Sequence, residues 1–130
     1  MKTEAAILWE AGRPWSVEEV ELDDPQRGEV RARLASSGLC HSDDHAVKQD
    51  ILVGLPIVGG HEGAGVVDEV GPGVSRLEPG DHVALVFMPA CGHCRWCSGG
   101  HSVLCDYGAL TMAGIPIADG KPARTPAARA

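Results

Sequence analysis

Four cysteines close together in the second half of the sequence constrain its fold more than any other feature. They are Cys91, Cys94, Cys97 and Cys105, separated by two, two and seven residues. Four thiolates can complete a tetrahedral shell around zinc and leave no open position, which is typical of a structural site. The stretch has too few apolar residues for a core of its own, so metal binding would supply its folding free energy. We therefore predict a structural zinc lobe over residues 91–105.

Three alternatives compete with zinc in this lobe. A bacterial ferredoxin-type iron–sulfur cluster has three residues before its last cysteine and a proline after it, whereas this sequence has seven, followed by Asp106. A thioredoxin-like redox pair is disfavoured by the two overlapping Cys-x-x-Cys units. Unliganded thiols are disfavoured because four cysteines fall within about fifteen residues, a spacing class that indicates zinc.

Glycine and proline are abundant in this chain and favour strands over helices. The 130 residues include 17 Gly and 9 Pro, and aromatic residues make up only 4%. This composition favours short strands joined by turns, with a core of Val, Ile, Leu and Ala. We predict a mostly β domain, a small barrel carrying the zinc lobe, and a disordered tail at residues 121–130.

Alternation of apolar and polar residues locates the individual elements. A short helix is expected at Ser42–Lys48, with Ser42 or Asp43 as its N-cap. In the strand that begins at Val30, the apolar residues alternate with arginines, which indicates a half-buried strand. Strands are expected over 3–10, 16–22, from Val30 toward Cys40 and over 63–70, and a turn at residues 79–81 leads into the apolar run 83–87.

Charge and hydropathy exclude several classes of partner. The net charge is −7 and the eleven Lys and Arg residues are scattered, whereas recognition of nucleic acid needs a basic patch. The longest apolar stretch, residues 51–60, is too short to span a membrane, and the charged N-terminus does not resemble a signal peptide. We expect a cytoplasmic protein, in which five cysteines indicate metal binding or catalysis before disulfides.

A second group of metal-binding residue types lies between residues 40 and 62. Cys40, His61 and Glu62 offer a thiolate, an imidazole and a carboxylate, which together suit a catalytic zinc with one open position. Asp43 could orient the His61 imidazole, and Glu62 could do the same or bind the metal transiently. Each motif alone is weak, because a cysteine before a histidine is often only packing and Gly-His-Glu is often only a turn.

Taken together, these motifs resemble zinc-dependent medium-chain alcohol dehydrogenases. The similarity covers residues 3–115, and both the catalytic-zinc and the structural-zinc patterns occur in the family's order and spacing. Family members without zinc, such as quinone reductases, would not need the four-cysteine lobe. The resemblance implies a GroES-like, partly open β-barrel as the N-terminal catalytic domain, over residues 1–120. The matching stretches are 38–43, 59–65, 80–83 and the cysteine lobe.

The resemblance implies a role for each matching residue. Cys40 and His61 would bind the catalytic zinc, Ser42 would take the proton from the alcohol, and His45 would pass it toward solvent. His41 occupies the place of a basic residue against the cofactor pyrophosphate, and Phe87 that of a residue lining the substrate pocket. Without the neighbouring motifs, Ser42 would be interpreted as an N-cap and His45 as a surface residue.

Two family features have no counterpart in the sequence. The family's catalytic zinc has a third cysteine ligand downstream of the lobe, and no cysteine follows Cys105. The nicotinamide-binding half and its Gly-x-Gly-x-x-Gly motif are also missing. After Gly120 the family-like pattern fades. We therefore expect a truncated or frame-shifted gene product, or a fragment, that lacks the nucleotide-binding domain.

Two functions remain open on these grounds. The first is the N-terminal domain of a zinc-dependent alcohol dehydrogenase, acting on a small alcohol or aldehyde with NAD or NADP in its full-length form and inactive as this chain alone. The second is a zinc-binding module without activity that pairs with another chain or with itself. Homo-oligomers are expected because the face that packs on the nucleotide domain in the family would be exposed.

Overall fold

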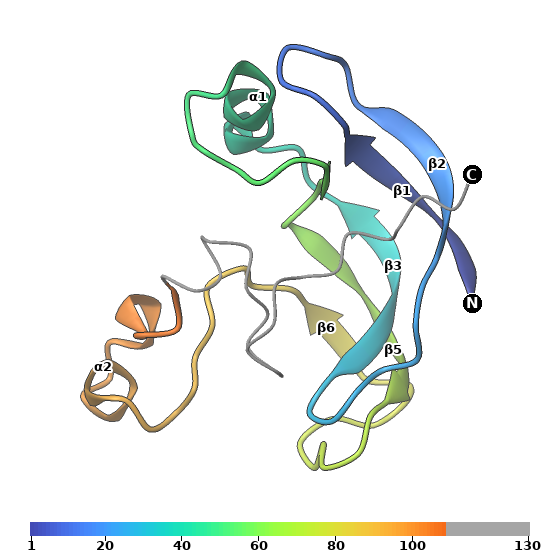
Figure 1. Cartoon of the computed structure of the whole chain (residues 1–130). Coiled ribbons are helices and arrows are strands. Elements are labelled where there is room, and N and C mark those ends of the chain that lie inside the picture. Colours follow the sequence, from blue (N-terminus) through green and yellow to red (C-terminus); the bar gives the residue numbers. More distant parts are fainter. Residues whose placement is uncertain (109–130) are drawn as a thin grey trace.

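The computed structural model describes residues 1–108, which form two three-stranded antiparallel sheets, a short helix and a cysteine lobe (Figure 1). One sheet has the strand order β2-β1-β4 and the other β3-β5-β6, and no ladder in this part of the chain joins the two. The expected tail at 121–130 and the domain end at 120 lie outside the described residues. The elements are β1 (Lys2–Leu8), β2 (Ser16–Glu21), β3 (Val30–Ser37), α1 (His41–Lys48), β4 (Ile57–Val58), β5 (Gly63–Val70), β6 (His82–Ala84), α2 (Arg95–Ser98) and the 3-10 helix η1 (Ser102–Leu104).

The buried core is small and made of aliphatic side chains, as the scarcity of aromatic residues predicts. β1 pairs with β2 from Lys2↔Glu21 to Ile7↔Ser16, and its last two residues also pair with β4. Helix α1 lies beside this sheet, and the loop after β1 is tied to the helix by the Gly12 N–H, which donates to the Val47 carbonyl at 2.7 Å. The buried hydrophobic residues are Ile7, Leu8, Ala46, Val67 and Cys105.

The second sheet is built on the long pairing between β3 and β5. The register runs from Val30↔Val70 to Ser37↔Gly63, with two shifts along it. The predicted half-buried alternation holds only in part, because Leu34 is 52% exposed. Leu34 lies over Gly63. Because glycine has no side chain, Gly63 cannot cover the Leu34 side chain.

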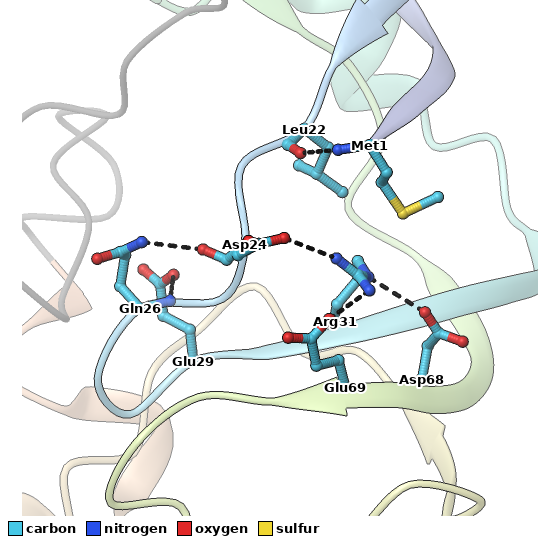
Figure 2. A network of polar contacts seen from close by, with 8 residues as sticks. All are labelled: Met1, Leu22, Asp24, Gln26, Glu29, Arg31, Asp68 and Glu69. Atoms are coloured by element: carbon cyan, nitrogen blue, oxygen red, sulfur yellow. Dashed lines mark hydrogen bonds and ion pairs between the residues drawn. The ribbon is translucent and has the colours of Figure 1, made fainter.

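An arginine at the start of β3 ties three segments together (Figure 2). The Arg31 side chain is only 17% exposed and makes ion pairs with Asp24 at 3.6 Å, Asp68 at 3.1 Å and Glu69. Asp24 lies between β2 and β3, whereas the other two carboxylates belong to β5. Several hydrogen-bonded charges around one guanidinium fix the chain between the two sheets better than an isolated surface pair would.

One local prediction is wrong. Helix α1 begins at His41, and its N-cap is Cys40 rather than Ser42 or Asp43. The reason is that the Asp43 carboxylate accepts a hydrogen bond from the Cys40 backbone N–H at 3.0 Å. Asp43 is thus the third residue of the helix and not its cap, and the helix starts one residue earlier than expected. The apolar run 83–87 is a strand only as far as Ala84.

Candidate metal centres

The ends of three neighbouring strands bring the first candidate site together. Cys40 follows β3, His61 precedes β5, and the two strands are antiparallel, so both residues lie at the same end of the sheet. The Gly38 N–H donates to the Glu62 carbonyl at 2.9 Å, which continues the ladder beyond the strands. β6 pairs antiparallel with β5 and leads to Phe87, whose ring centroid lies 5.6 Å from that of His61.

Cys40, His61 and Glu62 form a cluster of metal-binding atoms at this sheet end. Each residue offers one ligand atom, and the three atoms lie within 4.8 Å of one another. A thiolate, an imidazole and a carboxylate are ligands that zinc accepts, and three protein ligands leave one tetrahedral position for another molecule. The donor set therefore fits a zinc ion of the catalytic type.

Two neighbours orient the His61 ring within the cluster. The Asp43 carboxylate lies 3.5 Å from Nδ1 of His61, and the Ser42 hydroxyl lies 3.2 Å from Nε2. A carboxylate against one ring nitrogen leaves the other nitrogen to bind metal. Nε2 is therefore the nitrogen available for zinc, and the Ser42 hydroxyl lies beside it.

The electrostatic surroundings of the cluster favour a thiolate. The pKa of Cys40 is lowered by hydrogen bonds from the Ser42 side chain, from the Ser42 backbone and from His61, against a smaller opposing effect of burial and of the Glu62 charge. The pKa of His61 is raised, first of all by its hydrogen bond with Cys40. Cys40 also caps helix α1, where the helix dipole favours negative charge. A thiolate is the form in which cysteine binds metal.

A glycine makes room for the carboxylate of the cluster. A Cβ atom added at Gly38 would overlap Oε2 of Glu62 and would lie 3.1 Å from its Cβ and 3.3 Å from its Cδ. Glu62 therefore lies directly over Gly38. Nothing in the sequence predicts this contact, because only the continued ladder between residues 38 and 62 places Gly38 beneath Glu62.

The second candidate centre is the cysteine lobe, which extends from β6 away from the sheets (Figure 1). The sulfur atoms of Cys91, Cys94, Cys97 and Cys105 all lie within 4.8 Å of one another. Tetrahedral zinc with sulfur ligands at about 2.3 Å requires sulfur–sulfur separations of about 3.8 Å, and the Cys91 and Cys97 sulfurs are 3.9 Å apart. The four residues therefore fit a closed zinc site.

Backbone amides in the lobe point at the sulfur atoms. The Cys94 N–H donates to the Cys91 sulfur at 3.3 Å, and the Cys97 N–H donates to the Cys94 sulfur at 3.5 Å. The pKa of Cys94 is lowered to about 6 by the backbone N–H groups of Cys97 and Asp106. The pKa of Cys97 is raised to about 11, because burial and hydrogen bonds with the other thiols outweigh the N–H of Gly92. A divalent cation bound among the sulfurs would stabilise their thiolate forms.

Comparison with known proteins identifies the family. A family model described as alcohol dehydrogenase GroES-like domain matches residues 26–128. The chain belongs to this family. Alcohol dehydrogenase B of Mycobacterium tuberculosis is 52% identical over 121 residues, which make up 92% of this chain and 32% of the relative. The chain thus spans about a third of the length of that dehydrogenase.

Solved structures of alcohol dehydrogenases share the fold. The alcohol dehydrogenase zinc-binding domain protein from Burkholderia ambifaria matches with a TM-score of 0.84 and 42% identity, over 94% of this chain and 33% of that one. An alcohol dehydrogenase from Escherichia coli CFT073, complexed with the cofactor NADH, matches with a TM-score of 0.68 and 35% identity, over 80% and 30% of the two chains. The predicted family and its partly open, mostly β, GroES-like fold are confirmed.

The two histidines of α1 contact each other and nearby carboxylates rather than the cluster of Cys40, His61 and Glu62. Their rings stack at 4.5 Å with an interplanar angle of 7°. His41 pairs with Asp44 at 3.3 Å and His45 with Asp50 at 2.9 Å. Within residues 1–108, no hydrogen bond or ion pair joins either histidine to the metal-binding cluster.

Asp50, the partner of His45, is a residue that the sequence analysis missed. It follows the helix by two residues, so its contact depends on how the helix ends, for which the sequence offers no glycine signal.

The described part of the domain also contains no helix with the length and apolar character needed to cross a membrane.

Proposed function

We propose that this domain is the zinc-binding catalytic half of an alcohol dehydrogenase, which interconverts a small alcohol and its aldehyde or ketone with a nicotinamide cofactor. One observation carries the proposal: the Ser42 hydroxyl lies 3.2 Å from Nε2 of His61, inside a cluster whose three ligand atoms suit a zinc with an open position. A structural site has no use for a hydroxyl beside the metal-facing nitrogen, whereas alcohol oxidation needs a proton acceptor at that place.

In this proposal Cys40, His61 and Glu62 hold the catalytic zinc, and Asp43 holds the His61 ring in place. Zinc supplies Lewis acidity, which lowers the pKa of an alcohol hydroxyl. The Ser42 hydroxyl would accept the alcohol proton while it releases its own, and His45 would take up the released proton and pass it to solvent, away from the path of the hydride. The four cysteines of the lobe hold a second, structural zinc that replaces a core in that segment.

The remaining predicted residues belong to the parts of the reaction that need a second domain. His41, at the exposed N-terminus of α1, would face the pyrophosphate of the cofactor, with a weaker and more pH-dependent charge than an arginine. Phe87 packs edge-on against His61 and is 51% exposed, so one side of its ring is available to line a substrate pocket. The NADH complex of the Escherichia coli relative supports a nicotinamide as the cofactor.

Zinc stoichiometry tests this assignment. Elemental analysis of the purified chain, washed in metal-free buffer and then supplied with excess zinc, should give two zinc ions per chain. Cys40→Ser should reduce the number to one, and Cys105→Ser, as the matched change in the lobe, should remove the other ion. A single zinc in the unchanged chain would favour the alternative, a zinc-binding module without catalytic function.

A second measurement tests the open position. Cobalt(II) replaces zinc in such sites and reports its ligands by its visible absorption. The absorption bands of cobalt at the Cys40 site are identified as those that Cys40→Ser removes. Imidazole added to the cobalt-loaded chain should change these bands and leave the bands of the closed four-cysteine site unchanged. Unchanged spectra throughout would contradict a catalytic type of site.

A further inference from the structure

The C-terminal end of helix α1 has an unusual geometry for its sequence. Gln49 adopts a left-handed conformation with φ 60° and ψ 26°, and it is the one non-glycine residue with positive φ within residues 1–108. The Gln49 N–H donates to the Ala46 carbonyl at 3.3 Å, and the Asp50 N–H donates to the His45 carbonyl at 3.0 Å. These two bonds form a Schellman motif, which normally uses glycine at the left-handed position.

This helix end turns Asp50 back toward the preceding helical turn. The Gln49 side chain adds a hydrogen bond to the Ala46 carbonyl at 2.8 Å, which supports the left-handed residue. As a result, the Asp50 carboxylate lies 2.9 Å from Nδ1 of His45. The other groups near the ring are His41, stacked on it, and Asp44, which pairs with His41 and Lys48 rather than with His45.

The contact has a consequence for the protonation pattern of His45. A carboxylate is only an acceptor, so Nδ1 must carry the proton when the hydrogen bond is made. In the neutral ring the other nitrogen, Nε2, then has a free lone pair, which is the form that accepts a proton from a donor. A histidine that receives a proton through one nitrogen is best fixed through the other.

We propose that Asp50 is a positioning residue that holds His45 as the Nδ1–H tautomer, so that Nε2 is the nitrogen that receives the alcohol proton. This inference rests on the role proposed for His45 in the proton path. Asp50 neither touches the metal cluster nor takes a proton itself. The left-handed turn at Gln49 brings it to His45.

Nuclear magnetic resonance of the zinc-loaded 130-residue chain tests the proposal without a catalytic assay. Two-bond proton–nitrogen correlations report which imidazole nitrogen carries the proton, at a pH where the spectrum shows His45 to be neutral. We expect the Nδ1–H form in the unchanged chain. Asp50→Ala should shift the tautomer ratio toward Nε2–H by about threefold or more, given what hydrogen-bonded surface ion pairs contribute.

Two further variants separate positioning from general charge effects. Asp50→Asn keeps a carbonyl acceptor at the same place and should retain the Nδ1–H form. Asp44→Asn likewise removes one negative charge, here from helix α1 itself, and should leave the His45 tautomer unchanged. Amide spectra of all the variants should overlay outside α1, which shows that the fold is kept.

The outcome is independent of the proposed function. An Nε2–H tautomer in the unchanged chain, or a tautomer ratio that Asp50→Ala does not alter, would overturn the role of Asp50 even if two zinc ions bind. Conversely, a chain that binds a single zinc but shows the Asp50-dependent tautomer would refute the catalytic assignment and leave the positioning contact intact.

Discussion

Replacement of Gly38 by alanine should remove a zinc ligand while leaving the domain folded. The added Cβ would overlap Oε2 of Glu62, so the carboxylate has to swing out of the cluster. Gly38 does not have positive φ, and alanine therefore fits its backbone without strain. The atom that must move furthest is the end of a flexible side chain, and the Glu62 Cβ at 3.1 Å has to yield only slightly. We therefore expect the free energy of unfolding to change by no more than about 1 kcal/mol.

The effect on metal binding should be much larger than the effect on stability. Loss of the carboxylate leaves only Cys40 and His61 at the site. Even mutation of a residue that merely hydrogen-bonds to a metal ligand weakens metal binding by about 10- to 100-fold. Competition with a chromogenic chelator measures the two zinc affinities separately, because the four-cysteine site should keep its affinity. We expect the weaker affinity to fall at least about tenfold in Gly38→Ala.

A second glycine provides the matched control. Gly54 also lacks positive φ, and a Cβ added there meets no atom within 4 Å. Gly54→Ala should leave both zinc affinities unchanged. If Gly38→Ala bound two zinc ions as tightly as Gly54→Ala does, Glu62 would not be a ligand and the donor set of the first centre would have to be revised.

Four other outcomes follow from the described residues. Leu8→Ala should lower the free energy of unfolding by about 3 kcal/mol, because Leu8 is 0% exposed, while Leu52→Ala at a 90% exposed position should change it by less than about 0.5 kcal/mol in denaturant titrations. Removal of zinc with a chelator should abolish the protection of lobe amides from hydrogen exchange but not that of β1, since only the lobe relies on metal for its folding. The pKa of Glu18 is lowered by hydrogen bonds from Ser16 and then Trp9. The contribution of Glu18 to stability is therefore present above the unfolded pKa and is lost as pH falls through the folded pKa. The Trp9 indole N–H resonance should accordingly titrate with a midpoint below the usual pKa of a glutamate side chain. The purified chain alone should show no zinc-dependent reduction of NAD in the nicotinamide absorbance band, and robust turnover would contradict this.

Much of the fold could be predicted because the relevant signals are local. The alternation in residues 63–70 and the turns at glycine and proline depend on neighbours in the sequence, and β1, β2, β3 and β5 formed where strands were expected. The short strands β4 and β6 were not predicted. The four-cysteine lobe was predictable for the same reason, since its ligands lie within one short segment. Its geometry fits zinc because each Cys-x-x-Cys turn directs a backbone N–H to the preceding sulfur.

The first metal centre was only partly predictable, because its parts come from different strands. The identities of Cys40 and His61 followed from family resemblance, but their proximity depends on the register Ser37↔Gly63. The N-cap was misplaced because serine and aspartate are the usual caps, whereas here the aspartate reaches back from the third helical residue. Asp50 could not be found at all, since no propensity rule predicts glutamine in a left-handed helix end.

A double-mutant cycle tests whether Gly38 acts only through Glu62. If the glycine serves solely to make room for that carboxylate, then Gly38→Ala should cost no zinc affinity in a chain that already carries Glu62→Ala. The coupling free energy from the double-mutant cycle would then equal the whole effect of the single glycine change. An additive result, with Gly38→Ala weakening zinc equally in both backgrounds, would mean that the added methyl group acts on Cys40 through the backbone between residues 38 and 40. Whether the carboxylate binds the metal would then be decided by the effect of Glu62→Ala alone.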